Sequence, residues 1–167
     1  VGLVIGVNLS PRFASLLDLS TGTNFIRIRV WQSSLAILAD NPVTGLGLDQ
    51  FLYAFRGQYI MPDAIFDPDL SHPHNIVLDF WIRLGIGGLG VLIALLFAFG
   101  RSVFKSTVNH NTPSYRPLLV GATGAMFALL AHGLIDNSIY VIDLSVIFIL
   151  IMAIAANGQN LSRGSNY

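Results

Sequence analysis

Residues 84–100 of the chain read LGIGGLGVLIALLFAFG, a run without a charged side chain. Two further apolar runs follow at residues 117–134 and 139–156. A helix that crosses the hydrocarbon core of a bilayer needs about 20 apolar residues, with a range of about 17–25. The sequence therefore predicts three spanning helices, and the first gains length from preceding residues to cover 75–100. The glycines expected to loosen this first helix or to admit a close neighbour are Gly85, Gly87, Gly88 and Gly90.

The composition also indicates a membrane protein. Hydrophobic residues make up 53% of the chain and charged residues only 11%, whereas soluble domains carry about 25% charged residues. The formal net charge is zero, which argues against the basic surplus typical of nucleic-acid binding. The absence of cysteine excludes disulfides, thiolate chemistry and cysteine-based zinc sites.

The apolar stretch at residues 1–9 is typical of the last turns of another spanning helix, since it lacks the charged start of a signal peptide. Residues 10–74 then form a long external loop. We expect the whole chain, 1–167, to be the C-terminal part of one polytopic domain. The predicted fold is an all-α integral membrane protein with about three complete transmembrane helices, the end of a fourth, and a long external loop containing an amphipathic helix.

The orientation follows from basic residues near the ends of the spans. Short cytoplasmic loops carry an excess of Lys and Arg, so the connection between the first two spans and the end of the third are predicted to be cytoplasmic. Residues 10–74 and the corner at 133–138 then lie outside. The basic residues that decide this orientation are Arg101, Lys105, Arg116 and Arg163.

The amphipathic helix is predicted at residues 24–42, NFIRIRVWQSSLAILADNP, with an N-cap at Asn24 and a stop at Asn41 and Pro42. Such a helix lies on the bilayer surface or against other helices. On a helical wheel the expected apolar face holds Ile28, Trp31, Leu35, Leu38 and Ala39, and the polar face holds Arg29, Gln32, Ser33 and Asp40.

Several short motifs follow one another in a specific order. An Arg stands four residues before a Trp, and an apolar helix follows. The segment NPVTGLGLDQF (41–51) comes next, then a loop that ends in His-Asn, and then a glycine-rich membrane helix. This order resembles the C-terminal half of the O-antigen ligase and polymerase family of membrane glycosyltransferases, over roughly residues 25–156. HGLIDNSIY (132–140) is similar to the family's last external corner. The matching residues are Arg27, Trp31, Pro42, Gly45, Gly47, Phe51, His74, Asn75, Gly85 and Gly88.

The resemblance implies transfer of a glycan from undecaprenyl diphosphate to a sugar hydroxyl at the periplasmic face of the bacterial inner membrane. The acceptor would be lipid A core, a growing chain or sometimes a protein, in O-antigen ligation or polysaccharide polymerisation. Family members work without a metal or another cofactor. The motifs do not separate ligation from polymerisation.

His74 matches the family's His-Asn position, and we expect it to be the catalytic base. The acceptor hydroxyl must lose a proton as it attacks, and an imidazole with an ordinary pKa near 6.5 suits that task. Asn75 would orient the imidazole or cap the helix that starts there, and we group it with the substrate-binding residues. The alternative for His74 is a wetted interfacial residue without chemistry.

Arg27 and Arg29 are the candidates for binding the diphosphate, because a guanidinium is always charged and forks onto phosphate oxygens. On a regular helix the two side chains stand about 160° apart, so both cannot face one diphosphate. The register with Trp31 favours Arg27, whereas the helical wheel favours Arg29 as the solvent-facing residue. Both stay candidates, and the alternative for either is an arginine that reaches the lipid headgroups.

His132 and Asp136 are possible supporting residues, since they stand one helical turn apart near an external membrane end. One interpretation is that they pair and support the site from a second helix. The alternative is an inter-helix hydrogen bond with a packing role. A separate pair is expected between Asp79 and Arg83.

A metal site at His72-Pro73-His74 would need three or four ligands, with Asp67 or Asp69 completing it. The intervening proline restricts the geometry of the two imidazoles, so no metal is predicted there.

A second function class is a fragment of a lipid-linked saccharide transporter or flippase, which would bind the lipid diphosphate without chemistry. That class predicts polar groups at the middle of the bilayer. The polar groups of this chain cluster outside the spans, which favours an enzyme.

Overall fold

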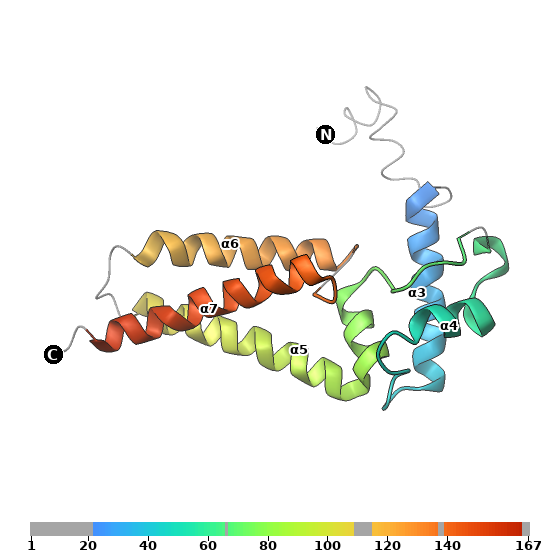
Figure 1. Cartoon of the computed structure of the whole chain (residues 1–167), viewed down its shortest axis with the longest axis horizontal. Helices are drawn as coiled ribbons and strands as arrows, with labels where there is room; N and C mark the ends of the chain where they lie inside the picture. Colours follow the sequence, from blue (N-terminus) through green and yellow to red (C-terminus); the bar gives the residue numbers. More distant parts are fainter. Residues whose placement is uncertain (1–21, 66, 109–114, 137–138, 165–167) are drawn as a thin grey trace, which may run out of the picture.

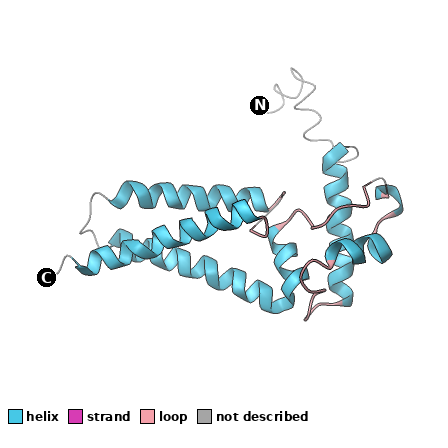
Figure 2. Ribbon diagram, in the orientation of Figure 1, coloured by secondary structure: helices cyan, strands magenta, loops and turns pink. Residues whose placement is uncertain are grey.

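The computed structural model describes residues 22–65, 67–108, 115–136 and 139–164. Within these residues the regular elements are all helical and none is a strand, as Figure 2 shows. The prediction of an all-α fold is confirmed for this part of the chain. In chain order the elements are α3 (Gly22–Asp40), α4 (Phe51–Ala54), the π-helical turn η1 (Phe55–Tyr59), the 3-10 turn η2 (Pro62–Ala64), α5 (Ile76–Val108), α6 (Arg116–Gly133) and α7 (Ile142–Gly164).

The three predicted spans correspond to α5, α6 and α7, with shifted ends. α6 matches the predicted 117–134 within one residue, α5 continues past residue 100 to Val108, and α7 begins three residues after the predicted start at 139. Of the helices described, only α5 is long and apolar enough to cross a membrane by length and composition. The number of complete spans stays a prediction, and residues 1–9 lie outside the described residues.

The helices α5, α6 and α7 form a bundle, with α7 packed on both of the others (Figure 1). Their shared core is aliphatic and aromatic, while other large apolar side chains point outward from the bundle. An outward apolar surface of this kind suits contact with lipid. The buried residues of this core are Phe99, Leu119, Ala122, Met126, Leu129, Phe148, Ile151 and Ala155.

At one end of the bundle, α3, α4 and η1 build a second layer with its own core, which includes the first turns of α5 (Figure 1). The C-terminal end of α5 and the N-terminal end of α6 lie at the opposite end of the bundle. The predicted external residues 22–74 are therefore not a simple loop but a small helical layer. Its buried core residues are Val30, Ile37, Leu38, Phe51, Phe55 and Ile82.

The predicted faces of α3 are right at some positions and wrong at others. Leu38 is buried and Gln32 and Asp40 are exposed, as expected. Leu35, however, is 57% exposed, and Ser33, expected on the polar face, is fully buried. The apolar residues of α3 occur on several sides, so its partners decide which side is buried. Two serines are tolerated there because Ser33 donates to the Tyr59 carbonyl at 2.6 Å and Ser34 to the Val30 carbonyl at 2.7 Å. The helix also begins at Gly22 rather than after Asn24, while its predicted stop before Asn41 is confirmed.

The second layer is joined to the bundle by a backbone clasp between residues 43–46 and the interrupted turn of α5. Gly85 has φ 65° and ψ −159°, so α5 breaks there and changes direction (Figure 1). The break exposes backbone groups that the helix would otherwise pair. The Leu46 N–H donates to the Ile82 carbonyl at 2.7 Å, and the Ile86 N–H donates to the Val43 carbonyl at 3.0 Å.

Glycine is required on both sides of this clasp. A methyl group added at Gly45 would overlap the Ile82 carbonyl, and one added at Gly85 would overlap the Val43 carbonyl. Gly45 also has a positive φ of 64°. The expectation that the glycines of this region allow a close approach is confirmed at Gly85.

The Gly85→Ala substitution is expected to lower the thermal unfolding midpoint of the full-length protein in detergent. The φ and ψ angles of Gly85 lie in a region populated almost only by glycine, where another residue costs on the order of 1–3 kcal/mol. The overlap of the added methyl group with the Val43 carbonyl increases that cost. Gly87→Ala is the matched control, because a methyl group there meets nothing within 4 Å. Equal midpoints for the two variants would contradict the clasp.

Candidate functional site

The site lies where α5 begins, and Asn75 sets its geometry. The Asn75 side-chain oxygen accepts the N–H groups of Val77 and Leu78 at 3.0 and 3.1 Å, which is the N-cap predicted for this residue. Its amide nitrogen donates to the Leu134 carbonyl at 2.9 Å. The start of α5 is thus tied to the end of α6, where Gly133 also packs against Ile76.

His74 immediately precedes this cap and has a positive φ of 52°. Non-glycine residues rarely adopt this conformation, although histidine, asparagine and aspartate do so more often than others. The imidazole Nδ1 lies 3.0 Å from Asp136 Oδ1. An ionised carboxylate only accepts hydrogen bonds, so Nδ1 carries the hydrogen in the neutral ring. Nε2 is then the basic nitrogen.

The same carboxylate also meets Arg27. Arg27 Nη2 lies 3.4 Å from Asp136 Oδ2, so one aspartate bridges an imidazole and a guanidinium that come from distant parts of the chain. The side chains of Arg27, His74 and Asp136 are 29%, 21% and 36% exposed. They are therefore held in place yet reachable by a ligand. Arg27 uses one nitrogen at this contact, and its remaining donors can serve an anion.

Arg29 points elsewhere. It forms an ion pair with Asp63 and a hydrogen bond from Nη1 to Gln32 Oε1 at 2.7 Å, and its guanidinium lies over the ring of Phe25. The structure therefore brings Arg27 and not Arg29 to His74. Both arginines belong to α3, and their side chains point in different directions, as the helical geometry predicts.

His132 contributes through its backbone. Its carbonyl accepts the N–H groups of Ile135 and Asp136 at 3.0 and 2.9 Å, which closes the turn after α6. The carboxylate of Asp136 pairs with His74 and Arg27, so the expected side-chain pairing of His132 with Asp136 is replaced by pairing across the chain. The His132 side chain is exposed.

His72 packs against His74, with ring centroids 4.3 Å apart. Its Nδ1 lies 3.0 Å from the Ser71 hydroxyl. Burial lowers the pKa of His72, and the nearby His74 lowers it further. Within the described part of the chain, no group of three or more histidine or aspartate side chains is placed to hold a metal ion.

A cavity of about 590 Å³ opens beside Arg27 and His74. It lies between the first turns of α3, the short η2 turn and the segment that leads into α5. Asp63 of η2 and Asp67 of the segment after it line the cavity. Sequence reasoning weighed Asp67 only as a metal ligand and did not name Asp63. The lining residues of the cavity are Gly22, Thr23, Phe25, Ile26, Arg27, Asp63, Asp67, Leu70 and His74.

A second ionic cluster lies on the first turns of α5. Arg83 Nε donates to Asp79 Oδ1 at 2.7 Å, as expected, and Arg83 also forms an ion pair with Asp49. The guanidinium lies over the ring of Tyr140, and only 10% of the Arg83 side chain is exposed. The cluster joins α5 to the loop before α4 and to the corner before α7. Asp49 had no signal in the sequence beyond its place in a glycine-rich turn.

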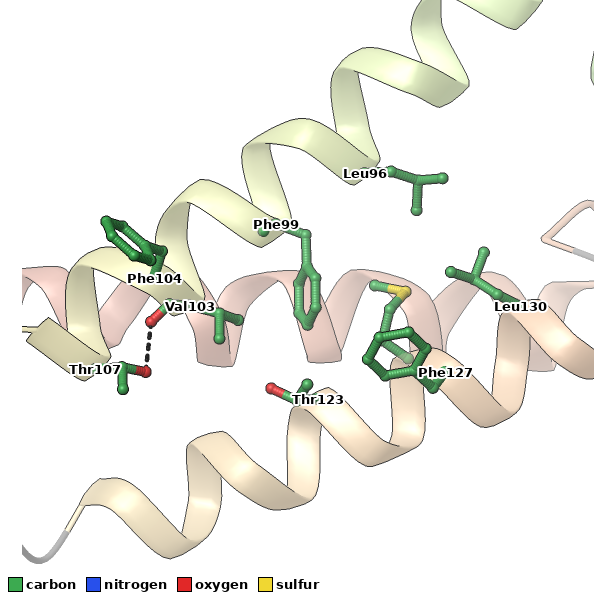
Figure 3. A pocket seen from close by; sticks show the side chains of 10 residues that line it. Leu96, Phe99, Val103, Phe104, Thr107, Thr123, Phe127 and Leu130 are labelled. Atoms are coloured by element: carbon green, nitrogen blue, oxygen red, sulfur yellow. Dashed lines mark hydrogen bonds between the residues drawn. The ribbon is translucent and has the colours of Figure 1, made fainter.

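A separate cavity of about 450 Å³ lies between α5 and α6 (Figure 3). Its walls are apolar side chains such as Phe99, Met126 and Phe127, and the Thr107 hydroxyl facing it donates to the Val103 carbonyl at 2.8 Å. None of its lining residues is ionisable, so it offers no acid or base. The cavity beside His74 is therefore the better candidate for chemistry.

A comparison of sequences identifies the family of the chain. A sequence profile described as O-antigen ligase matches residues 2–93, more than half of the 167 residues. The chain belongs to the O-antigen ligase family. The match covers Arg27, Gly45, His74 and Gly85, whereas the corner with Asp136 lies beyond it. Neither the curated proteins nor the solved structures contain a match.

Membership of the O-antigen ligase family makes this a bacterial membrane-associated protein with ligase or polymerase type activity. Proteins of this family have a lipid-linked saccharide and a glycan acceptor as their general kinds of partner.

The depressed pKa of His72 predicts a pH-dependent stability. The folded protein binds a proton at His72 less readily than the unfolded chain, whose imidazole has the ordinary value of 6.5. Stability is therefore fully present above pH 6.5 and is lost as the pH falls from there through the folded-state pKa. Among the nearby charged groups, His74 and Arg83 lower the pKa of His72, whereas Asp79 and Asp136 raise it.

The His72→Phe variant, which keeps an aromatic ring, is expected to lose less thermal stability than wild type between about pH 7.5 and pH 5.5. The measurement is the unfolding midpoint in detergent at both pH values. His132→Phe serves as the control, since its side chain is exposed. An equal loss in wild type and His72→Phe would contradict the prediction.

Proposed function

We propose that this protein transfers a glycan from undecaprenyl diphosphate to a sugar hydroxyl at the outer face of the bacterial inner membrane. The observation that carries the proposal is the Asp136 carboxylate, which lies 3.0 Å from His74 and 3.4 Å from Arg27. The two groups that the reaction needs, a base and a phosphate-binding cation, are thus fixed at one point.

The proposed reaction is a displacement at the anomeric carbon of the donor. The acceptor oxygen forms a bond to that carbon while the bond from carbon to the phosphate oxygen breaks. The proton of the acceptor hydroxyl passes to His74 Nε2, and undecaprenyl diphosphate leaves with the bonding electron pair. Proton removal by a positioned base contributes about 10²–10⁴-fold to the rate.

Asp136 acts as a positioning residue in this scheme. Its carboxylate holds Nδ1–H and stabilises the imidazolium that forms when Nε2 takes the proton. Arg27 stabilises the charge that develops on the departing diphosphate, because guanidinium binds phosphate oxygens in a forked geometry. The chain's own residues supply both functions, and the proposal includes no metal or other cofactor.

The arrangement of the helices supports an extracytoplasmic site. α3, His74 and Asp136 lie at one end of the bundle, and the C-terminal end of α5 and the N-terminal end of α6 lie at the other (Figure 1). Arg101, Lys105 and Arg116 belong to these two helix ends, where an excess of basic residues is typical of the cytoplasmic side. The donor's diphosphate would meet Arg27 at the opposite surface.

Removal of the base tests the proposal in cells. His74→Asn, in the full-length gene expressed in a host that lacks its own copy, is expected to accumulate lipid-linked saccharide and to lose finished surface glycan. Asparagine tolerates the positive φ of this position, so the variant separates chemistry from folding. His132→Asn, at matched protein level, is the exposed-histidine control. Unchanged glycan in His74→Asn would overturn the mechanism, and single repeat units on the surface would indicate a polymerase.

The two arginines are expected to differ in the same assay. Arg27→Ala removes the guanidinium beside His74 and should reduce transfer at least as strongly as removal of one transition-state donor, about 10²-fold. Arg29→Ala removes only contacts to Asp63, Gln32 and Phe25 and should cost less. Arg56→Ala, which breaks an exposed ion pair with Asp69, controls for loss of positive charge. A larger loss for Arg29→Ala than for Arg27→Ala would reverse the assignment.

A further inference from the structure

We propose that the cavity beside Arg27 and His74 is a saccharide-binding subsite in which Asp67, with Asp63, reads the hydroxyl groups of an uncharged sugar ring. This inference rests on the proposed function and adds the residues that select the sugar. The cavity has about 590 Å³, within the range of about 300–1,000 Å³ found for small-molecule sites.

The walls of the cavity differ in chemistry. Arg27 and His74 supply a cationic and basic side, while Asp63 and Asp67 supply carboxylates. Phe25, Ile26 and Leu70 supply apolar surface. A pyranose ring presents hydroxyl groups around its edge and C–H groups on its faces. The combination of carboxylate acceptors with apolar surface matches both parts of such a ring.

Asp67 is the carboxylate available to a ligand. Among the described residues, none forms an ion pair or a side-chain hydrogen bond with its carboxylate, whereas Asp63 is held by Arg29 and Asp69 by Arg56. The Asp67 backbone is nevertheless anchored, because its N–H donates to the Ala64 carbonyl at 3.2 Å. The position of Asp67 is therefore fixed by its backbone, while its carboxylate has no partner among the described residues.

Charge sets the direction in which a substrate can enter. The donor's diphosphate is attracted to Arg27 and repelled by the carboxylates of Asp63 and Asp67. A part of the substrate without negative charge is favoured on the aspartate side, and a sugar that carries its own carboxylate is disfavoured there. The sugar ring then lies against Asp67, and its reacting end lies near His74.

The test uses the purified full-length protein and compares Asp67→Ala with Asp69→Ala. Both variants remove one exposed carboxylate from the same segment, but only Asp67 lines the cavity. Initial rates are measured while lipid-linked saccharide, extracted from cells that lack the gene, is varied at fixed acceptor. They are then measured while acceptor glycan, extracted from cells that make no donor, is varied at fixed donor.

In Asp67→Ala the KM for one of the two substrates is expected to rise about tenfold, the effect of losing one hydrogen bond to a charged group. A rise for the acceptor places the acceptor's sugar in the cavity, and a rise for the donor places the donor's sugar there. Unchanged KM values, or the same rise in Asp69→Ala, would overturn the proposal.

Direct binding separates a failure of this inference from a failure of the proposed function. The probes are lipid-linked saccharide, acceptor glycan, and undecaprenyl diphosphate without sugar, each titrated against wild type and Asp67→Ala. We expect Asp67→Ala to weaken binding of one sugar-bearing probe, the substrate whose KM rises, and to leave binding of undecaprenyl diphosphate unchanged. If the wild-type protein shows this binding pattern but performs no transfer, the subsite is supported and the transferase is rejected. Unchanged binding of both sugar-bearing probes, or an equal effect on all three probes, would reject the subsite.

Discussion

Two backbone hydrogen bonds hold the external layer against the bundle, and the geometry of the site depends on them. They join residues 43–46 to the interrupted turn of α5 at Gly85. Because α5 turns at this glycine, its first ten residues run beside α3 instead of continuing the axis of the bundle (Figure 1). His74, at the start of that segment, is thereby carried to the helix that holds Arg27.

The third member of the site comes from the corner after α6. The Asn75 side chain donates to the Leu134 carbonyl and the Ile76 side chain packs against Gly133, so the beginning of α5 lies close to the end of α6. Asp136 follows two residues later and reaches both His74 and Arg27. Close contacts of this kind leave little freedom, and the proposed role of His74 as a base requires such a defined geometry.

Features that depend on near neighbours in the chain were predictable. The long apolar runs located α5, α6 and α7, the Asn75 cap followed from its place before a helix, and Arg83 found Asp79 one turn away. The buried face of α3 was not predictable, because two serines are buried in it and donate hydrogen bonds to backbone carbonyls. A helical wheel sorts side chains by polarity alone and does not include the carbonyl groups that accept these bonds.

In the site, too, some residues could be named from the sequence, whereas others required the fold. His74 and Arg27 were named from the motif order, but the choice between Arg27 and Arg29 required the position of Asp136, which is 109 residues from Arg27. Asp136 was itself assigned to His132, its neighbour on a helical turn, because sequence spacing favours local pairs. Asp63 and Asp67 lie in an irregular segment without periodicity, so only the fold could place them at the cavity.

The clasp is built from amide and carbonyl groups alone, and none of its atoms carries a formal charge. Dissolved ions screen exposed charge pairs over about 10 Å at 0.1 M ionic strength, but they have little effect on hydrogen bonds between uncharged amide and carbonyl groups. The partly exposed pair of Arg27 and Asp136 is sensitive to such screening. Ionic strength can therefore alter the field felt by an incoming anion while the scaffold that places the charges keeps its shape.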